Sequence, residues 1–237
     1  MKRFYPFFTV STVFIVIFAL SSCAARIEGA LAADGSAVLS VNMSLENRMA
    51  SLIRLLSDAG GQTGVPVLDG PAIARSMADA PGIASVSFRN TSSTAIEGQV
   101  RISRINDFLS PANGRGFITF EQTTSGGRFE VNINRQTSPA IIELLSSEIS
   151  DYLNALMAPI ASGEVMTRSE YLEIVSTFYN VGISDEIAFS RIRATIDFPG
   201  TITSIRGGTF SGRRANFDIS LLDLLVLETP MIFEVRW

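Results

Sequence analysis

The sequence contains no histidine, one cysteine and one lysine, and these shortages exclude much of enzyme chemistry. Without histidine there is no serine–histidine or cysteine–histidine nucleophile and no imidazole acid or base. The lysine is Lys2, so the chain beyond it can form neither a Schiff base nor a phosphate-loop lysine. Carboxylate chemistry, a serine or tyrosine activated by a carboxylate, and oxygen-bound Ca²⁺ or Mg²⁺ remain. The sequence leaves open whether the chain is an enzyme.

The first residues have the three parts of a secretory signal. Lys2 and Arg3 are followed by an apolar run over residues 4–20, which ends in small residues before Cys23. This order predicts a signal peptide over residues 1–22 that is removed on export. The alternative is a retained membrane helix, because about 17 apolar residues just span a bilayer. No basic cluster follows Leu20 to stop transfer, which favours the cleaved signal.

The tetrapeptide Leu20-Ser21-Ser22-Cys23 resembles the lipobox of bacterial lipoproteins, in which an aliphatic residue and two small residues precede cysteine. The resemblance implies that Cys23 receives a diacylglyceryl group, becomes the N-terminus and is acylated again on its amine. More than one chain is needed, since a single acyl chain gives only marginal attachment. Ala24 replaces the aspartate that often marks inner-membrane retention. We therefore expect an envelope protein, with the periplasmic face of the outer membrane favoured over the inner membrane.

Charge limits the partners of residues 23–237. Without Lys2 and Arg3, 17 of the 19 basic residues remain, all arginine, against 23 acidic residues. An acidic balance argues against nucleic acid and against electrostatic docking on anionic lipid, because both rely on basic clusters. With Cys23 lipidated, neither a disulfide nor a cysteine-based zinc site can form. The expected partner is the membrane itself, through the lipid on Cys23.

Strand-like runs at both ends of this region enclose a helical segment over residues 138–190. We predict one α+β domain over residues 23–237, with mostly antiparallel sheets packed against two to four amphipathic helices. Asp34-Gly35 marks a hairpin between the first two strands. The predicted strands are 26–31, 37–43, 83–90, 96–103, 115–123, 128–134, 191–198, 201–205, 215–219 and 231–237.

Helix signals are of several kinds. Ser44 is predicted to cap a helix with Met49, Leu52, Ile53 and Leu56 on one face, ended by Gly60-Gly61. Pro71 begins a second helix, and Ser138-Pro139 begins a third that runs to about Met157. Thr167 and Glu170 match a capping box. A short turn is expected near residues 184–189, and residues 220–227 fit either a helical turn or a strand.

The layout of the region after Cys23 resembles that of bacterial envelope proteins called LppM-like. The shared features are a lipidated start, an early strand with an Asp-Gly turn, a helix, and paired strands closed by a Pro-Gly turn. The last part reads Phe198-Pro199-Gly200-Thr201-Ile202, then Gly207-Gly208, then residues 215–219. The resemblance implies an α+β envelope module that binds lipids or lipid-linked glycans. The helical segment 138–190 departs from the pattern.

Three local patterns are candidate sites. The apolar faces of two helices could wall a groove for acyl chains, or form ordinary core; the residues are Leu145, Ile149, Leu153, Leu156, Val175 and Phe178. An acidic helix side could bind Ca²⁺ or pair a carboxylate with serine, or simply be solvated; it holds Glu143, Ser147, Glu148 and Asp151. Arg213-Arg214 could bind a phosphate headgroup bidentately, or lie in an exposed turn. No cofactor is otherwise expected.

These patterns support three hypotheses. The leading one is a membrane-anchored lipoprotein that binds a phospholipid, a fatty acid or another amphiphile. The second is a phospholipase-like hydrolase that uses a carboxylate-assisted serine or a metal-bound water. The third is a structural lipoprotein that assembles with other envelope proteins through an exposed strand edge, such as residues 115–123.

Overall fold

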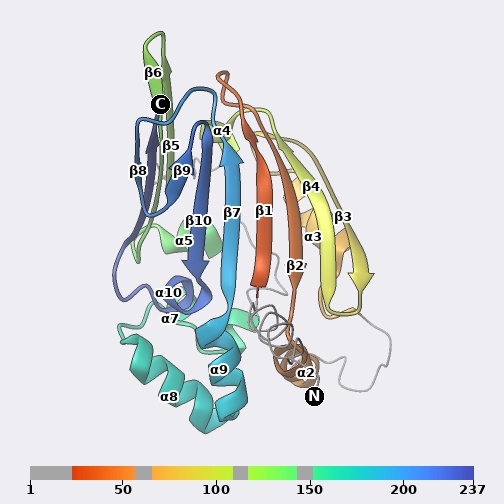
Figure 1. Cartoon of the computed structure of the whole chain (residues 1–237). Coiled ribbons are helices and arrows are strands. Elements are labelled where there is room, and N and C mark those ends of the chain that lie inside the picture. Colours follow the sequence, from red (N-terminus) through yellow and green to blue (C-terminus); the bar gives the residue numbers. More distant parts are fainter. Residues whose placement is uncertain (1–22, 57–65, 109–116, 143–151) are drawn as a thin grey trace, which may run out of the picture.

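The computed structural model describes residues 23–56, 66–108, 117–142 and 152–237. Strands and helices alternate along these ranges (Figure 1), which confirms the predicted α+β class. The strands are β1 (Cys23–Leu31), β2 (Ala37–Ser44), β3 (Ile83–Ser92), β4 (Ala95–Ile102), β5 (Ile118–Thr123), β6 (Gly126–Ile133), β7 (Arg191–Asp197), β8 (Ser204–Arg206), β9 (Thr209–Ser211), β10 (Arg214–Ser220) and β11 (Met231–Arg236). The helices are α2 (Asn47–Leu56), α3 (Gly70–Ala78), α4 (Ile105–Phe108), α5 (Ser138–Ile142), α7 (Pro159–Ser162), α8 (Arg168–Phe178), α9 (Val181–Phe189) and α10 (Leu221–Val226).

Seven strands form a large sheet in the order β3-β4-β2-β1-β7-β10-β9. Its neighbours are antiparallel except for β1 and β7, which run parallel in the middle of the sheet. A parallel pair requires a long crossover, and here the crossover includes strands β5 and β6 of the second sheet and the helical segment. The first strand of the described chain is therefore placed beside a strand from its last quarter.

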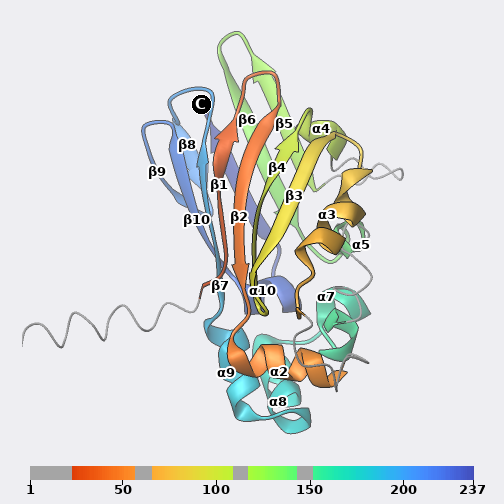
Figure 2. The same cartoon turned by 90° about the vertical axis from the view of Figure 1, so that its right-hand side faces the viewer.

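A second sheet of four strands, in the order β5-β6-β11-β8, lies against one face of the large sheet (Figure 2). One apolar cluster joins the facing sides, with Leu31, Val100 and Phe217 from the large sheet and Phe120 and Val235 from the small one. Side chains alternate between the two faces of a strand. The opposite face of the large sheet is consequently left to polar side chains.

The helices α2, α8, α9, α7 and α10 gather at one end of the sheets, away from the C-terminus (Figures 1 and 2). They enclose a second apolar cluster, whose fully buried members include Tyr171, Val175 and Ile187. Met231 packs against both clusters, so the helical end and the sheets share one side chain. Hereafter this part of the molecule is called the helical end.

Local signals in the sequence are confirmed where the turn or cap is made by neighbouring residues. Gly35 takes a φ of 81° in the β1–β2 turn, and Asp34 Oδ1 accepts hydrogen bonds from the backbone and side chain of Ser36. Thr167 and Glu170 form the predicted capping box of α8. Residues 220–227, which the sequence left open, contain α10, capped by the Ser220 side chain.

Other boundaries differ from prediction. Ser44 is the last residue of β2, and α2 begins three residues later, at Asn47. The N–H groups of Arg48 and Met49 donate to the Glu186 carboxylate, at 3.3 and 2.8 Å, so a residue of α9 satisfies two donors in the first turn of α2. The turn expected near residues 184–189 is the nine-residue helix α9, and the short strand β9 was not predicted. Gly60-Gly61 lie outside the described residues.

The long helix predicted over residues 138–157 is described only at its ends. Helix α5 covers Ser138–Ile142, and residues 152–155 are helical. Met157 takes a φ of 52° and closes this second piece. Residues 143–151 lie outside the described ranges, so the continuity of the helix remains a prediction.

Buried Tyr171 leads to a pH prediction. Burial raises the pKa of its hydroxyl above the ordinary value of 10.0. A raised folded-state pKa contributes stability that is complete below the unfolded pKa and is lost as pH rises above it. Because residues 23–237 contain no Lys and no His, we expect stability to be nearly constant from about pH 5 to about pH 9 and to fall above about pH 10. Urea midpoints measured across pH check this.

At low pH the loss of stability comes from carboxyl groups whose pKa is lowered in the folded state. Hydrogen bonds from Thr167 lower the pKa of Glu170, and the Arg214 guanidinium lowers the pKa of Asp197. Such carboxyls stabilise the fold above their ordinary pKa values, and this stability is lost as pH falls through the lowered ones. In Tyr171→Phe, the fall in stability at alkaline pH should begin at a higher pH, and the fall at acid pH should be unchanged. If stability fell at the same alkaline pH in that variant, the loss could not be assigned to Tyr171.

Candidate membrane-facing site

Strand β1 begins at Cys23, the residue that the lipobox resemblance marks for lipidation. In the parallel β1–β7 register, Cys23 is the partner of Arg191. Arg191 follows α9 after one residue, Ser190, so the start of β1 lies where the large sheet meets the helical end (Figure 1). No linker separates residue 23 from the first strand, and a chain anchored there would be held close to its membrane.

Large apolar side chains are exposed at this same end. Phe178, at the end of α8, is 69% exposed, Val181, at the start of α9, is 64% exposed, and Phe189, at the end of α9, is 69% exposed. Leu55 on α2 is 78% exposed. Single exposed apolar residues are ordinary, whereas these four belong to three helices of the same end.

The predicted acyl-binding residues are divided by the fold. Leu156 and Val175 are buried in the helical cluster, and Leu153 packs against it partly buried. Phe178 instead points into solvent. The other two, Leu145 and Ile149, lie outside the described residues. Among the described members, Phe178 alone is placed where it could meet a membrane from outside.

The sequence did not single out Val181 or Phe189. The apolar positions of α9 extend around the helix, so the pattern does not separate Ile183 and Ile187, which are buried, from the exposed pair. Only Ser184, Asp185 and Glu186 of its nine residues are polar, so α9 has more apolar residues than one buried face requires. The exposed pair could have been suspected only from this excess of apolar residues.

The other two candidate patterns have different outcomes. Arg214 forms a two-pronged ion pair with its cross-strand partner Asp197, with both N–O distances at 2.9 Å. Its guanidinium is therefore engaged within the sheet, and Arg213 lies exposed at the β9–β10 turn. The acidic helix side with Glu143 and Asp151 lies outside the described residues. Within the described ranges, no three acidic or cysteine side chains gather as metal ligands.

Hydroxyl groups near carboxylates have local structural roles. Ser36 and Asp34 form the β1–β2 turn, and Thr167 and Glu170 form the cap of α8. The buried serines donate to main-chain carbonyls: Ser138 to Arg135, Ser184 to Leu172 and Ser190 to Glu186. The Ser36–Asp34 and Thr167–Glu170 pairs are therefore turn and cap contacts.

The open face of the large sheet carries two shallow hollows. One of about 420 Å³ is bordered by Ser40, Asn42, Ser87, Arg89, Glu97 and Gln99. The other, of about 290 Å³, lies nearer the helical end and is lined by Arg26, Asn42, Met43, Ser44, Thr91, Ala95 and Ile96. Both share Asn42 of β2. Hydrogen-bonding side chains around them favour a polar group over an acyl chain.

Strand β5, named above as an exposed edge, lies at the edge of the small sheet. Its centre is already occupied, because Asn106 accepts from Phe120 N–H at 3.0 Å and donates to Phe120 C=O at 2.9 Å. A side-chain amide on these two groups blocks pairing with another strand, one way in which proteins protect an edge. This contact weakens the case for assembly through β5.

We expect Asn106→Ala to destabilise the fold by about 1–2 kcal/mol, because two main-chain groups of the half-covered edge lose their partners. Concentration-dependent dimerisation should follow, since the edge is then free to pair. Urea denaturation and sedimentation velocity measure the two effects. Asp107→Ala is the matched control: its ion pair with Arg104 is largely exposed, and its loss should change stability by less than about 0.5 kcal/mol. A variant as stable and monomeric as the parent would contradict the prediction.

No family model and no curated protein matches the sequence. Among solved structures, the chain is similar to the NMR structure of the folded domain of LppM from Mycobacterium tuberculosis. The TM-score is 0.37 and the identity 10%, over 100% of this chain and 94% of that chain. This is the group that the layout of the sequence resembles.

Proposed function

We propose that this chain is a lipid-anchored protein of the bacterial cell envelope that rests on the membrane with its helical end and binds lipid there. The observation that carries the proposal is the coincidence of two features at one end of the fold. Strand β1 begins at Cys23 where the large sheet meets the helical end, and Phe178, Val181 and Phe189 are exposed on helices α8 and α9 of that end. Amphiphilic surfaces next to a lipid anchor supply the second contact that stable membrane attachment needs.

Burial elsewhere supports this orientation. The fully buried side chains include Phe198 and Val235 between the sheets and Tyr171 among the helices. Large apolar groups are therefore buried in both clusters, and the exposed ones at the helical end are exceptions. The described helices include none long and apolar enough to cross a bilayer. On this proposal, attachment comes from acyl chains on Cys23, and the bound amphiphile is a phospholipid or fatty acid.

The full chain, expressed in bacteria and extracted in mild detergent, tests the proposal by mass spectrometry. We expect an N-terminal peptide that begins at Cys23 and carries acyl mass, and phospholipid or fatty acid released by organic extraction. An unmodified N-terminus at Met1 would contradict the anchor. Lysolipid and free fatty acid in equal amounts would place the hydrolase hypothesis first.

Paired variants locate the lipid contact. Phe178→Ser and Phe210→Ser each remove one exposed phenyl ring, the first from the helical end and the second from β9. We expect retained lipid to fall in the first variant and to be unchanged in the second. Equal retention in both variants would contradict contact through the helical end.

A further inference from the structure

The β1–β7 pairing brings three arginines together beside the start of β1. Arg26 and Arg193 are direct partners in the parallel register, and Arg191 is the partner of Cys23. All three belong to the alternating set that points to the open face of the large sheet. Hereafter Arg26, Arg191 and Arg193 are called the arginine cluster.

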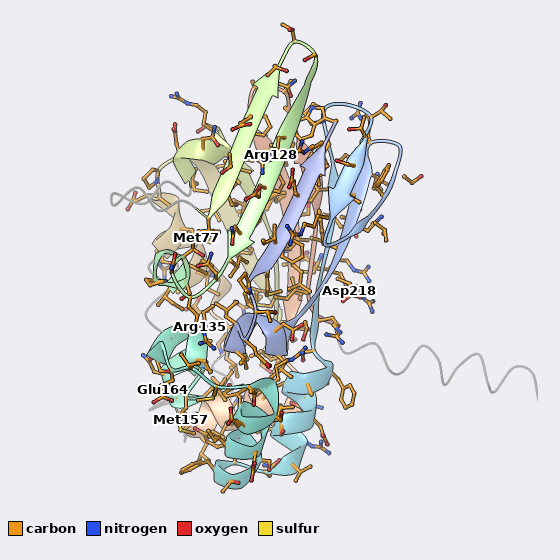
Figure 3. All side chains as sticks on the ribbon, turned by 90° about the vertical axis from the view of Figure 1, so that its left-hand side faces the viewer. Met77, Arg128, Arg135, Met157, Glu164 and Asp218 are labelled. Carbon is orange, nitrogen blue, oxygen red and sulfur yellow. The ribbon has the colours of Figure 1, made fainter. Side chains whose placement is uncertain are left out.

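Few negative charges balance this cluster. Asp218 lies on the same face (Figure 3), 3.9 Å from Arg191 Nε and 3.6 Å from Arg193 Nε, and these contacts are too long for hydrogen bonds. Glu28, two residues along β1 from Arg26, also points to this face. Within the part of the chain that the structure describes, Arg26 has no ion pair, and it lines the 290 Å³ hollow with Asn42, Ser44 and Thr91. The face therefore has a surplus of positive charge at the end nearest Cys23.

We infer that the arginine cluster binds the anionic headgroups of the bilayer in which Cys23 is anchored. The inference rests on the proposed function. A guanidinium matches a phosphate with paired donors, and the hollow beside Arg26 offers hydroxyl and amide groups for the rest of a headgroup. Phe189 is 69% exposed and precedes Arg191 by only two residues, so an apolar side chain and a cationic one are close along the chain. Interfacial protein surfaces combine these two contacts.

The cluster departs from the expectation set by net charge. Averaged over residues 23–237 the chain is acidic, and no two of these arginines are neighbours in sequence. Attraction to a membrane surface acts only within about a Debye length, roughly 8 Å at physiological salt. Local charge at the contact therefore decides binding, and the acidic residues elsewhere contribute little.

The test uses the full lipidated chain in vesicles of brominated phosphatidylcholine, with or without phosphatidylglycerol. Phe189→Trp places a fluorophore beside the cluster, and Phe210→Trp places one on β9. The native Trp237 is the shared background in both chains. We expect strong quenching of the tryptophan at position 189 in anionic vesicles, weaker quenching in neutral vesicles or at high salt, and little quenching at position 210.

Two triple variants in the Phe189→Trp chain isolate the arginines. Changing Arg26, Arg191 and Arg193 to Gln should lower the population in contact with anionic vesicles, by roughly fivefold per arginine, to the level seen in neutral vesicles. Changing Arg75, Arg101 and Arg213 to Gln removes the same charge from exposed positions outside the cluster and should leave quenching unchanged. Far-ultraviolet circular dichroism verifies that both variants fold.

Two results would overturn the inference. Equal quenching in neutral and anionic vesicles, or equal loss in both triple variants, would exclude headgroup binding by the cluster while leaving the anchor intact. A chain that fails to float with either kind of vesicle would overturn the proposed function as well. Flotation therefore separates the two failures.

Discussion

Cys23→Ser is expected to release the protein from membranes. The change removes the thiol that would carry the diacylglyceryl group and leaves strand β1 unaltered in length and register. The remaining contacts, the exposed residues of the helical end and the arginine cluster, are reversible, since stable anchoring needs at least two strong signals. Fractionation followed by flotation should show the parent chain almost entirely with membranes and the variant largely soluble.

The comparison needs a variant that keeps the anchor. Phe189→Ser removes one exposed apolar contact beside β1 and should leave the protein with membranes, because acyl chains dominate attachment. A Cys23→Ser chain that fractionates like the parent would show that acylation at Cys23 does not hold the protein. Retention of residues 1–22 as a membrane helix would then be the leading explanation.

Tyr171→Ala is expected to destabilise the fold by about 3–5 kcal/mol, the range for deletion of a fully buried aromatic side chain. Tyr171 is completely buried among the helices, and its hydroxyl donates to Leu156 C=O at 3.3 Å. Tyr171→Phe keeps the ring and loses only this bond, at a cost of about 1 kcal/mol. Urea denaturation followed by far-ultraviolet circular dichroism measures both changes.

The same titrations test whether residues 23–237 unfold together. Trp237 packs against Phe120 and Phe198 in the cluster between the sheets, far from Tyr171, so its emission reports on that cluster. If the chain is one cooperative domain, tryptophan emission and circular dichroism should give the same midpoint in the parent and in Tyr171→Ala. A shift seen by circular dichroism alone would divide the fold into two units and contradict the single-domain prediction.

The proposed orientation defines how the open face of the large sheet lies relative to the membrane. Its end nearest Cys23 would lie at the lipid headgroups, and the 420 Å³ hollow around Asn42, Gln99 and Ser87 would face the aqueous side. The same arrangement places the small sheet and Trp237 away from the bilayer (Figure 1). A lipid contact at the helical end therefore leaves the rest of the polar face accessible.

Sequence alone determined the features that depend on neighbouring residues. The Asp34-Gly35 turn, the Thr167–Glu170 cap and the strand predicted over residues 96–103 follow from bonds and burial within a few residues, and the structure confirms them, with β4 at Ala95–Ile102. The α+β class follows from the same local patterns. The N-terminal signal and the lipobox are also local, and they remain predictions because residues 1–22 lie outside the described ranges.

Only the tertiary structure decided which distant residues meet. The cap of α2 comes from Glu186, and Arg26 lies beside Arg193 because β1 and β7 pair in parallel. Pairing between distant strands depends on the whole packed sheet, and nothing local to either strand specifies its partner. For the same reason, the exposed Phe189 could not be told from the buried Ile187 until the helices were packed. The candidate membrane-facing site is thus a product of packing, built from residues that the sequence keeps apart.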